Sequence, residues 1–165
     1  MLKWSFSNFP FPNPFMASNQ NQKLVLDTQA LTDDFFEEAK LLGIMAPVKA
    51  YQFCWKVNSA LGIDFRINID LEIQLKKKQR NYFFSVYEYC EPTNCLKHFL
   101  YHNHCDGEYL LPEFKHLDFL WLLKDDHVSN ETLQQLVQSI KNINGVQLVV
   151  ELTGEKIKNR EYLVF

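Results

Sequence analysis

Glycine is scarce in this chain: there are five among 165 residues, and they lie far apart. Loops that cradle phosphates need closely spaced glycines, as in the Walker loop and the dinucleotide fingerprint GxGxxG, and neither pattern occurs. The elbow motif that exposes a nucleophilic serine is missing as well. The sequence therefore argues against ATP and dinucleotide chemistry, and we expect no cofactor.

Positive charge is also in short supply. Lys and Arg number 17 against 20 Asp and Glu, which gives a formal net charge of -3 and a pI near 5.9. Most affinity for nucleic acid comes from neutralising a series of phosphates, so nucleic acid is not expected as a partner. The basic cluster at residues 76–80 is interpreted as a solvated hairpin tip, with contact to an acidic partner patch as the alternative.

Long apolar runs are absent from the sequence. No window approaches the roughly 18 consecutive apolar residues of a membrane helix, so no membrane is expected as a partner. Pro10, Pro12 and Pro14 interrupt the segment where a secretory signal needs an unbroken apolar helix. The four cysteines are interpreted as free thiols, because disulfides belong to oxidising compartments. We expect a soluble, cytoplasmic protein.

Apolar and aromatic residues, in contrast, are abundant. Hydrophobic residues make up 47% of the chain and aromatics 15%, with 14 Phe, which is typical of a globular protein with one sizeable core. We assign a single domain to residues 23–165. Residues 1–22 are interpreted as a disordered leader or as an upstream extension, since translation beginning at Met16 instead of Met1 would remove most of them. A short aromatic docking peptide is the alternative for this segment.

The spacing of apolar residues predicts an α+β fold. One helix is expected from Pro47 to a stop at Gly62, and a second is expected to begin near Ser129 or Asn130. Strands are predicted over residues 23–27, 39–46, 65–75, 82–89, 97–105, 116–124 and 146–152, of which residues 65–105 hold three hairpin-linked strands that form a meander. Because strands and helices do not alternate as βαβ units, we expect a mostly antiparallel sheet with two helices on one face.

Two stripes of side chains carry specific predictions about burial. In the first helix, residues at three- and four-residue spacing are expected to face the core; they are Val48, Tyr51, Cys54, Trp55, Asn58 and Leu61. Asn58 would then be a hydrogen-bonded polar group of the core. In the strand over residues 65–75, the alternation is expected to bury Phe65, Ile67, Ile69, Leu71, Ile73 and Leu75.

Residues 111–119 place ionisable groups between apolar runs, and they are the most distinctive segment of the chain. The candidate binding residues in this segment are Leu111, Pro112, Glu113, Lys115, His116 and Asp118. The segment resembles the motif that names the IPExxxVDY family of bacterial proteins: Pro112, Glu113 and Asp118 match it, whereas Leu111, Leu117 and Phe119 stand for its Ile, Val and Tyr. The resemblance extends over residues 23–165 and names a family, but it implies no reaction.

Asp118 interrupts an apolar run. An ionised carboxylate in a core costs several kcal/mol unless donors surround it, so Asp118 is either satisfied by backbone N–H groups and a basic partner or kept protonated. We expect a buried, ionised Asp118 that ties the Pro112 loop to the sheet, with Lys115 or His116 as counter-charge. Contact with a ligand or partner is the first alternative, and acid–base work together with Glu113 is the second.

Three histidines share one face if residues 97–105 form a continuous strand: His98, His102 and His104. Two imidazoles at this spacing could reach one metal ion, with Cys105 or Glu113 as a third ligand. No CxxC or HExxH spacing supports such a site, so we expect no metal. The histidines are instead expected on a solvated face, with Phe99, Tyr101 and Asn103 on the opposite one.

Two interpretations of function follow from these patterns. The first is a non-enzymatic interaction module, whose partner is a protein of unknown identity, a second copy of the chain included. The alternative is a small-molecule- or metal-binding enzyme that uses Glu113, His116 and Asp118 with the histidine face. An enzyme needs those groups to converge in a pocket, whereas a module needs an exposed apolar patch or a free sheet edge.

Overall fold

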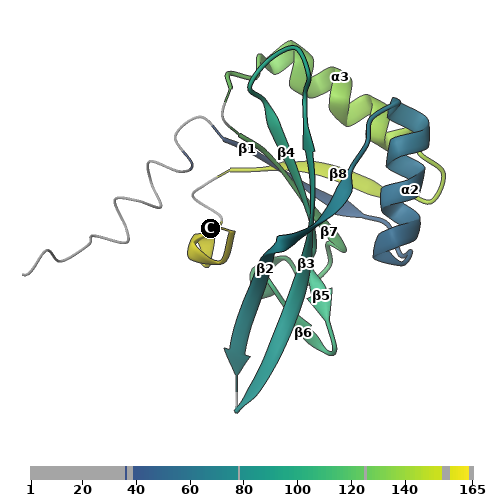
Figure 1. The fold of residues 1–165 in the computed structure, drawn as a ribbon. Helices are drawn as coiled ribbons and strands as arrows, with labels where there is room; N and C mark the ends of the chain where they lie inside the picture. The colour runs from purple at the N-terminus through teal and green to yellow at the C-terminus, as the bar shows by residue number, and fades with distance from the viewer. Residues whose placement is uncertain (1–35, 37–38, 78, 125, 154–156, 164–165) are drawn as a thin grey trace, which may run out of the picture.

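The computed structural model describes residues 36, 39–77, 79–124, 126–153 and 157–163. The predicted strand over residues 23–27 and the choice between Met1 and Met16 lie outside the described residues. Within these residues the chain folds as a six-stranded sheet and a small two-stranded sheet, with two α-helices (Figure 1). The predicted α+β fold class is confirmed.

The large sheet has the order β2-β3-β4-β7-β1-β8, and every neighbouring pair in it is antiparallel. The predicted meander is present as β2, β3 and β4. The strands of this sheet are β1 (Lys40–Met45), β2 (Arg66–Lys77), β3 (Arg80–Cys90), β4 (Lys97–His102), β7 (Phe119–Lys124) and β8 (Leu148–Leu152). The small sheet pairs β5 (His104–Cys105) with β6 (Glu108–Tyr109).

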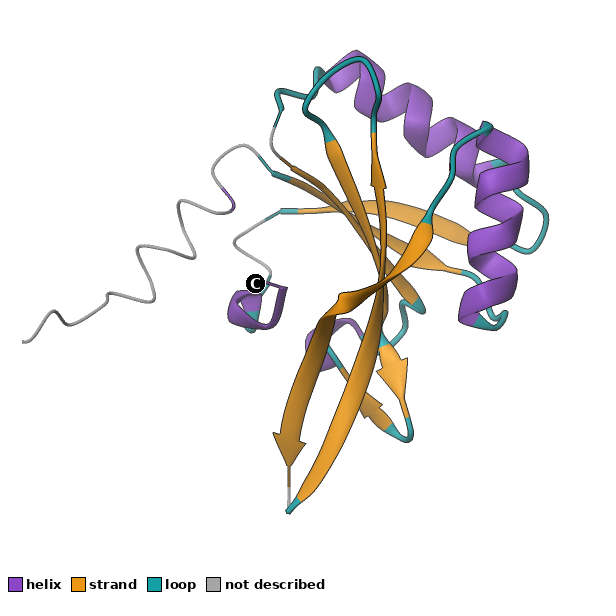
Figure 2. Cartoon of the chain, viewed as in Figure 1, coloured by secondary structure: helices purple, strands orange, loops and turns teal. Residues whose placement is uncertain are grey.

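Both helices, α2 (Ala50–Leu61) and α3 (Asn130–Lys141), lie on one face of the large sheet, as predicted (Figure 2). The start of α3 is confirmed, because the Ser129 hydroxyl accepts a hydrogen bond from the backbone N–H of Thr132. The end of α2 is confirmed at Gly62, which adopts the left-handed conformation, with φ of 67°.

The predicted start of α2 at Pro47 is wrong. The helix begins at Ala50, because Lys49 is extended and its N–H donates to the side chain of Gln52, which fixes the first turn there. The apolar stripe predicted to face the core is also wrong in part, because two of its residues are exposed. Tyr51 and Trp55 are 61% and 68% exposed, and the buried residues are Phe53, Cys54 and Val57.

The buried face of α2 differs from the predicted one because of how the helix packs on the sheet. Phe53 lies fully buried and stacks on Phe119 of β7, with ring centroids 4.2 Å apart. Both candidate stripes have helical spacing, so periodicity alone could not choose between them. Packing a phenylalanine against the central strand buries more apolar surface than packing the amphipathic Tyr51 would.

The sheet is covered on both faces. Residues of the helix side form one core, which includes Leu42, Phe53 and Trp121. The opposite face carries a second core, which includes Phe84, Tyr101 and Leu163, and its covering segments are η1 (Pro112–Phe114) and η3 (Arg160–Leu163). Central strands of such a sheet are buried on both sides: β7 is accordingly an almost continuous apolar run, and the four inner residues of β4, from His98 to Tyr101, are buried.

The predicted alternation along β2 is broken by a β-bulge between Asn68 and Glu72. Phe65, just before the strand, is buried as predicted, but Ile67 and Ile69 are 54% and 85% exposed, which corrects the sequence prediction. Beyond the bulge, Leu71, Ile73 and Leu75 are half-buried against the second core, on the opposite face of the sheet from Phe65.

The basic hairpin tip finds acidic partners within the chain itself. Lys77 forms an ion pair with Glu108 of β6, at 2.6 Å between nitrogen and oxygen, and Arg80 pairs with Asp106 of the small hairpin. These exposed pairs contribute little stability individually. They do connect the tip of the β2–β3 hairpin to the β5–β6 hairpin beside it (Figure 1).

Candidate functional site

The motif segment over residues 111–119 forms a tight loop that leads into β7. Pro112 begins the short helix η1, and the strand starts at Phe119, three residues later than predicted. Leu111 and Leu117 are fully buried anchors, whereas Pro112, Lys115 and His116 are exposed. The segment therefore has two apolar ends fixed in the second core and a polar middle at the surface.

Asn103 organises this loop from inside the protein. Its side chain is 0% exposed, and its amide nitrogen donates to the carbonyl oxygens of Phe114 and Leu117, at 3.0 Å and 2.9 Å. Its amide oxygen accepts from the N–H of Leu111 at 2.8 Å. The backbone N–H of Asn103 also donates to the carbonyl of Asp118 at 2.9 Å. One buried amide thus satisfies three backbone groups of the loop.

Glu113 attaches the C-terminal segment to the loop. One carboxylate oxygen accepts from the backbone N–H groups of Lys158 and Asn159, at 2.7 Å and 3.1 Å, and the other accepts from the side-chain amide of Asn159 at 2.8 Å. Burial by itself raises the pKa of Glu113, but these hydrogen bonds and one from its own backbone lower it, and the net pKa lies below the ordinary value.

Asp118 ties the start of β7 to the end of β1. Its carboxylate accepts from the N–H of Ala46 at 2.7 Å, and its own N–H donates to the carbonyl of Ile44 at 2.9 Å. The side chain is half-buried rather than buried, which corrects the prediction. The donor comes from the end of β1 and not from the Pro112 loop, while Lys115 and His116, the expected counter-charges, are exposed.

The two carboxylates of the motif therefore bind different parts of the chain. Glu113 accepts hydrogen bonds from residues 158 and 159, and Asp118 accepts one from residue 46. The arrangement links three segments that are distant in sequence: the end of β1, the motif loop and the C-terminal segment. Each carboxylate is accounted for by a backbone contact that stabilises the fold.

The predicted histidine face is wrong, because the strand ends at His102 and Asn103 turns the chain. His104 belongs to β5, in the separate small sheet. His98 is buried rather than solvated: its Nδ1 accepts from the indole N–H of Trp121 at 3.1 Å, and its Nε2 lies 3.0 Å from a Glu91 oxygen. Since the indole can only donate, the proton of neutral His98 is on Nε2.

The pKa values of these imidazoles follow their surroundings. Burial lowers the pKa of His98 below its ordinary value, although Glu91 opposes the shift. Burial and the neighbouring His104 lower the pKa of His102, against the opposing charge of Asp118. Among the described residues no three His, Cys, Asp or Glu side chains are grouped so that they could hold a metal ion.

Asn58 and Cys54 of α2 both contact the backbone of Phe65. The Asn58 amide accepts from the Phe65 N–H at 2.9 Å and donates to the Phe65 carbonyl at 3.0 Å, so it connects the helix to the start of β2. The Cys54 thiol lies 3.5 Å from the same carbonyl. Burial, with a smaller contribution from Asp64, raises the pKa of Cys54 to about 11, which leaves it protonated at neutral pH.

The β-bulge of β2 is a feature that sequence reasoning missed. The side-chain oxygen of Asn68 accepts from the N–H groups of Asp70 and Leu71, at 2.9 Å and 3.1 Å, and its nitrogen donates to Glu88 at 2.6 Å. Asn68 therefore satisfies the backbone that the bulge leaves unpaired. The signal in the sequence is the polar pair around Ile69, an Asn followed two residues later by an Asp, which is typical of a local side-chain turn.

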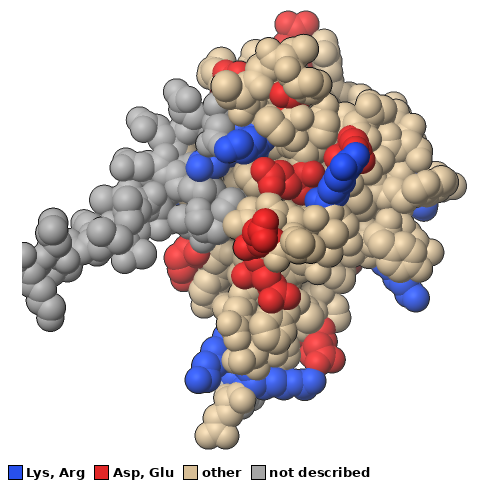
Figure 3. Space-filling view, in the orientation of Figure 1, with Lys and Arg blue, Asp and Glu red and all other residues tan. Residues whose placement is uncertain are grey.

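Ile67 and Ile69 form what we call the apolar bulge. A shallow hollow of about 470 Å³ adjoins it, and its lining includes Asp64, Asp70 and Glu88. Arg66 also lines the hollow, but it forms an ion pair with Asp64, at 2.6 Å. In the view of Figure 3, acidic side chains gather over the middle of the molecule; basic ones lie at the tip of the β2–β3 hairpin and, in smaller groups, beside the acidic ones in the upper half.

Comparison with known proteins assigns no family: no protein-family model matches the sequence, and no curated protein matches it. The resemblance of residues 111–119 to the IPExxxVDY motif therefore stays a prediction. In the described part of the chain, no helix is both long and apolar enough to cross a membrane.

Proposed function

We propose that this protein is a non-enzymatic interaction module, and that its partner contacts the apolar bulge on β2. The observation that carries the proposal is the isoleucine at position 69, which is 85% exposed and is held out by a hydrogen-bonded bulge. A single exposed apolar side chain needs no explanation. A second one beside it, on a backbone fixed by a dedicated Asn, favours a contact surface.

Fixing the bulge before a partner arrives lowers the entropy cost of binding. The Asn68 side chain accepts from two successive backbone N–H groups, so the loop at Asp70 and Leu71 is already ordered in the free protein. Bulges are known to re-aim side chains near functional sites. A partner that covers Ile69 gains hydrophobic contact without having to order this backbone.

The charges around the apolar bulge define the chemistry of the partner. Three carboxylates and one arginine line the adjoining hollow, and the arginine is paired with Asp64, so the carboxylates of Asp70 and Glu88 remain in excess. Complementary charge steers association and excludes wrong partners. We therefore expect the partner segment to present an apolar side chain flanked by Lys or Arg.

Family and location belong to this proposal as well. The match of Pro112, Glu113 and Asp118 to the IPExxxVDY motif supports a bacterial protein of that family. Four free cysteines, two of them exposed, support the reducing conditions of the cytoplasm. The alternative of an enzyme using Glu113, His116 and Asp118 has no comparable support, because the two carboxylates bind different segments and His116 points to solvent from an exposed position.

Quantitative affinity capture from a lysate of the native cell tests the proposal. The bait is the full chain in three forms: wild type, Ile69→Asp, and Tyr51→Asp as a control that changes another exposed large side chain, on α2. We expect a protein that wild type and the control retain and that Ile69→Asp loses, with retention falling as salt rises because the acidic hollow is screened. Equal retention of every captured protein by all three baits would contradict the proposal.

A further inference from the structure

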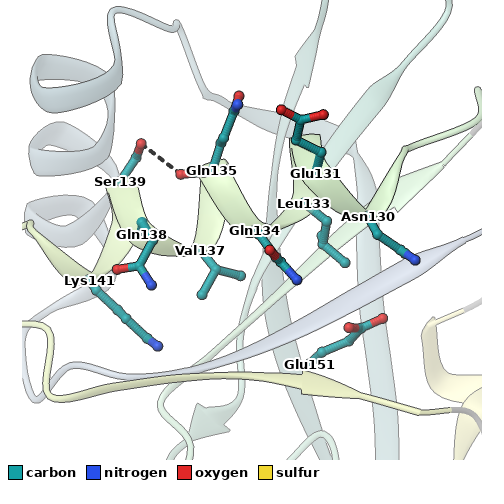
Figure 4. Close-up of a pocket in the computed structure, with 10 residues that line it drawn as sticks. All are labelled: Asn130, Glu131, Leu133, Gln134, Gln135, Val137, Gln138, Ser139, Lys141 and Glu151. Carbon is teal, nitrogen blue, oxygen red and sulfur yellow. Dashed lines mark hydrogen bonds between the residues drawn. The ribbon is translucent and has the colours of Figure 1, made fainter.

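Among the described residues, a groove of about 860 Å³ runs along α3 and is lined on the β8 side by Glu151. Figure 4 shows the helix running above the strand, with Val137 and Leu133 turned toward it. In the described sheet β8 is the outermost strand, paired only with β1. Every second residue of such an edge strand directs its N–H and C=O away from the sheet, where another strand can pair with it.

The two edges of the described sheet differ. The β2 edge carries a bulge and several charged residues, which are the usual protections against edge-to-edge pairing. β8, with the sequence LVVEL, has no Pro, no Lys and no bulge in its pairing with β1, and its Leu148 is exposed. Its one charged residue is Glu151, which lines the groove beneath α3.

The sequence of β8 is compatible with antiparallel pairing to itself. Opposite residues of an antiparallel pair lie on the same face, so pairing centred on Val150 sets Leu148 against Leu152 of the second copy. In the same register Val149 lies against Glu151 of the second copy. All five residues of the strand are then paired, and the exposed Leu148 gains an apolar neighbour.

The charges of the groove fit the same two-fold arrangement. Lys141, the last residue of α3, and Glu151 lie at opposite ends of the groove (Figure 4). A two-fold rotation that pairs the β8 strands exchanges these ends, so Lys141 of each copy comes to the end that holds Glu151 of the other. Within one chain, the Lys40 Nζ atom lies 3.8 Å from the Glu151 Oε1 atom. Both side chains are partly exposed, so the Glu151 carboxylate can accept a second cation from the other copy.

We propose that a second copy of this chain docks at the groove, by antiparallel β8–β8 pairing with Lys141 and Glu151 paired between the copies. The two six-stranded sheets become one continuous sheet, and the two α3 helices lie side by side over the junction. This interface is separate from the apolar bulge, which is on the opposite edge of the sheet, so each surface can be tested without the other.

Sedimentation velocity of the full chain, from about 1 to 200 µM, measures the association, because a short ladder with a helix contact is a small interface. We expect conversion from monomer to dimer within this range. Each single variant, Lys141→Glu or Glu151→Lys, should raise Kd about tenfold, since it turns two attractive pairs of the dimer into repulsive ones. The double variant should restore the wild-type Kd to within about threefold, because both pairs reform with exchanged signs.

Lys76→Glu, at the exposed tip of the β2–β3 hairpin, is the matched charge control and should leave Kd unchanged. Thermal melting of each variant checks that the fold is retained. A wild-type chain that stays monomeric over the whole range would overturn the proposal, and would mean that another segment or another protein takes this edge. If the single variants dimerise with the wild-type Kd, or if the double variant keeps a raised Kd, the interface lies elsewhere and the proposal is overturned as well.

Discussion

Replacing the buried amide of Asn103 should be the most damaging single polar substitution in the motif region. Asn103→Ala removes two donors and one acceptor that serve the carbonyls of Phe114 and Leu117 and the N–H of Leu111. The loop backbone cannot shift to find other hydrogen-bond partners, because the side chains of Leu111 and Leu117 are fully buried and hold it in place. The loop must either leave polar groups unpaired or open to water.

The size of the effect follows from the number of groups left unpaired. A typical hydrogen bond contributes about 1 kcal/mol net, and an orphaned buried group costs about 1–3 kcal/mol. Three groups, with partial compensation by water entering the small cavity, give a loss of about 3–5 kcal/mol in the free energy of unfolding. Asn103→Asp keeps the acceptor for Leu111 and loses both donors, so its cost should be similar.

Urea denaturation of the full chain measures this loss, with Asn81→Ala on the exposed side of β3 as the control. The control should change the free energy of unfolding by less than about 0.5 kcal/mol. A loss below about 1 kcal/mol for Asn103→Ala would refute the reasoning, since it would mean that the loop has other ways to satisfy its backbone.

Three further predictions concern the ionisable groups. Asp118→Asn should cost only about 1 kcal/mol in urea denaturation, because the half-buried carboxylate accepts one bond, from Ala46; an unchanged or higher stability would contradict its structural role. The lowered pKa of Glu113 means that its contribution to stability is complete above the ordinary carboxyl pKa of about 4.3 and is lost as pH falls through the lowered value. Glu113→Gln should therefore flatten the acid side of a curve of unfolding free energy against pH, and an identical acid side would exclude this linkage. Cys54, with a pKa near 11, should react with iodoacetamide at pH 8 far more slowly than the exposed Cys90, as peptide mass spectrometry would show; equal rates would mean that α2 opens readily.

The fold class could be predicted from the sequence because its signals are local. The period-two pattern after Gly62 and the Ser129 cap each act over a few residues, and the structure has the predicted strand, although a bulge interrupts its alternation, and the predicted helix start. Asp106 and Gly107 both have positive φ in the turn between β5 and β6, which is typical of an Asp-Gly hairpin turn.

Sequence patterns could not predict which of two similar faces of a helix or strand is buried by the rest of the chain. The stripes through Phe53 and through Tyr51 have the same spacing, and the stacking on Phe119 decides between them. His98 has no local sign of burial, since its neighbours Trp121 and Glu91 come from other parts of the chain. Contacts between distant segments decide these cases, and local periodicity is silent about them.

The motif shows the same limit at the candidate site. Its Pro, Glu and Asp predict a special loop, and the structure has one. The central residue of that loop, Asn103, precedes the motif by eight residues and looked like one more side chain on a strand face. The partners of Glu113 and Asp118 are 45–46 and 72 residues away in sequence, beyond the reach of any local pattern.

Site-specific photocrosslinking from position 69 tests the central claim most directly. A photoreactive residue replaces Ile69 in the full chain, and the same residue at Tyr51, which is also exposed, provides the control. The proposed function predicts a discrete adduct in native cell lysate from position 69, absent from position 51 and suppressed by excess unlabelled wild-type chain. No adduct from position 69, or the same adducts from both positions, would contradict it.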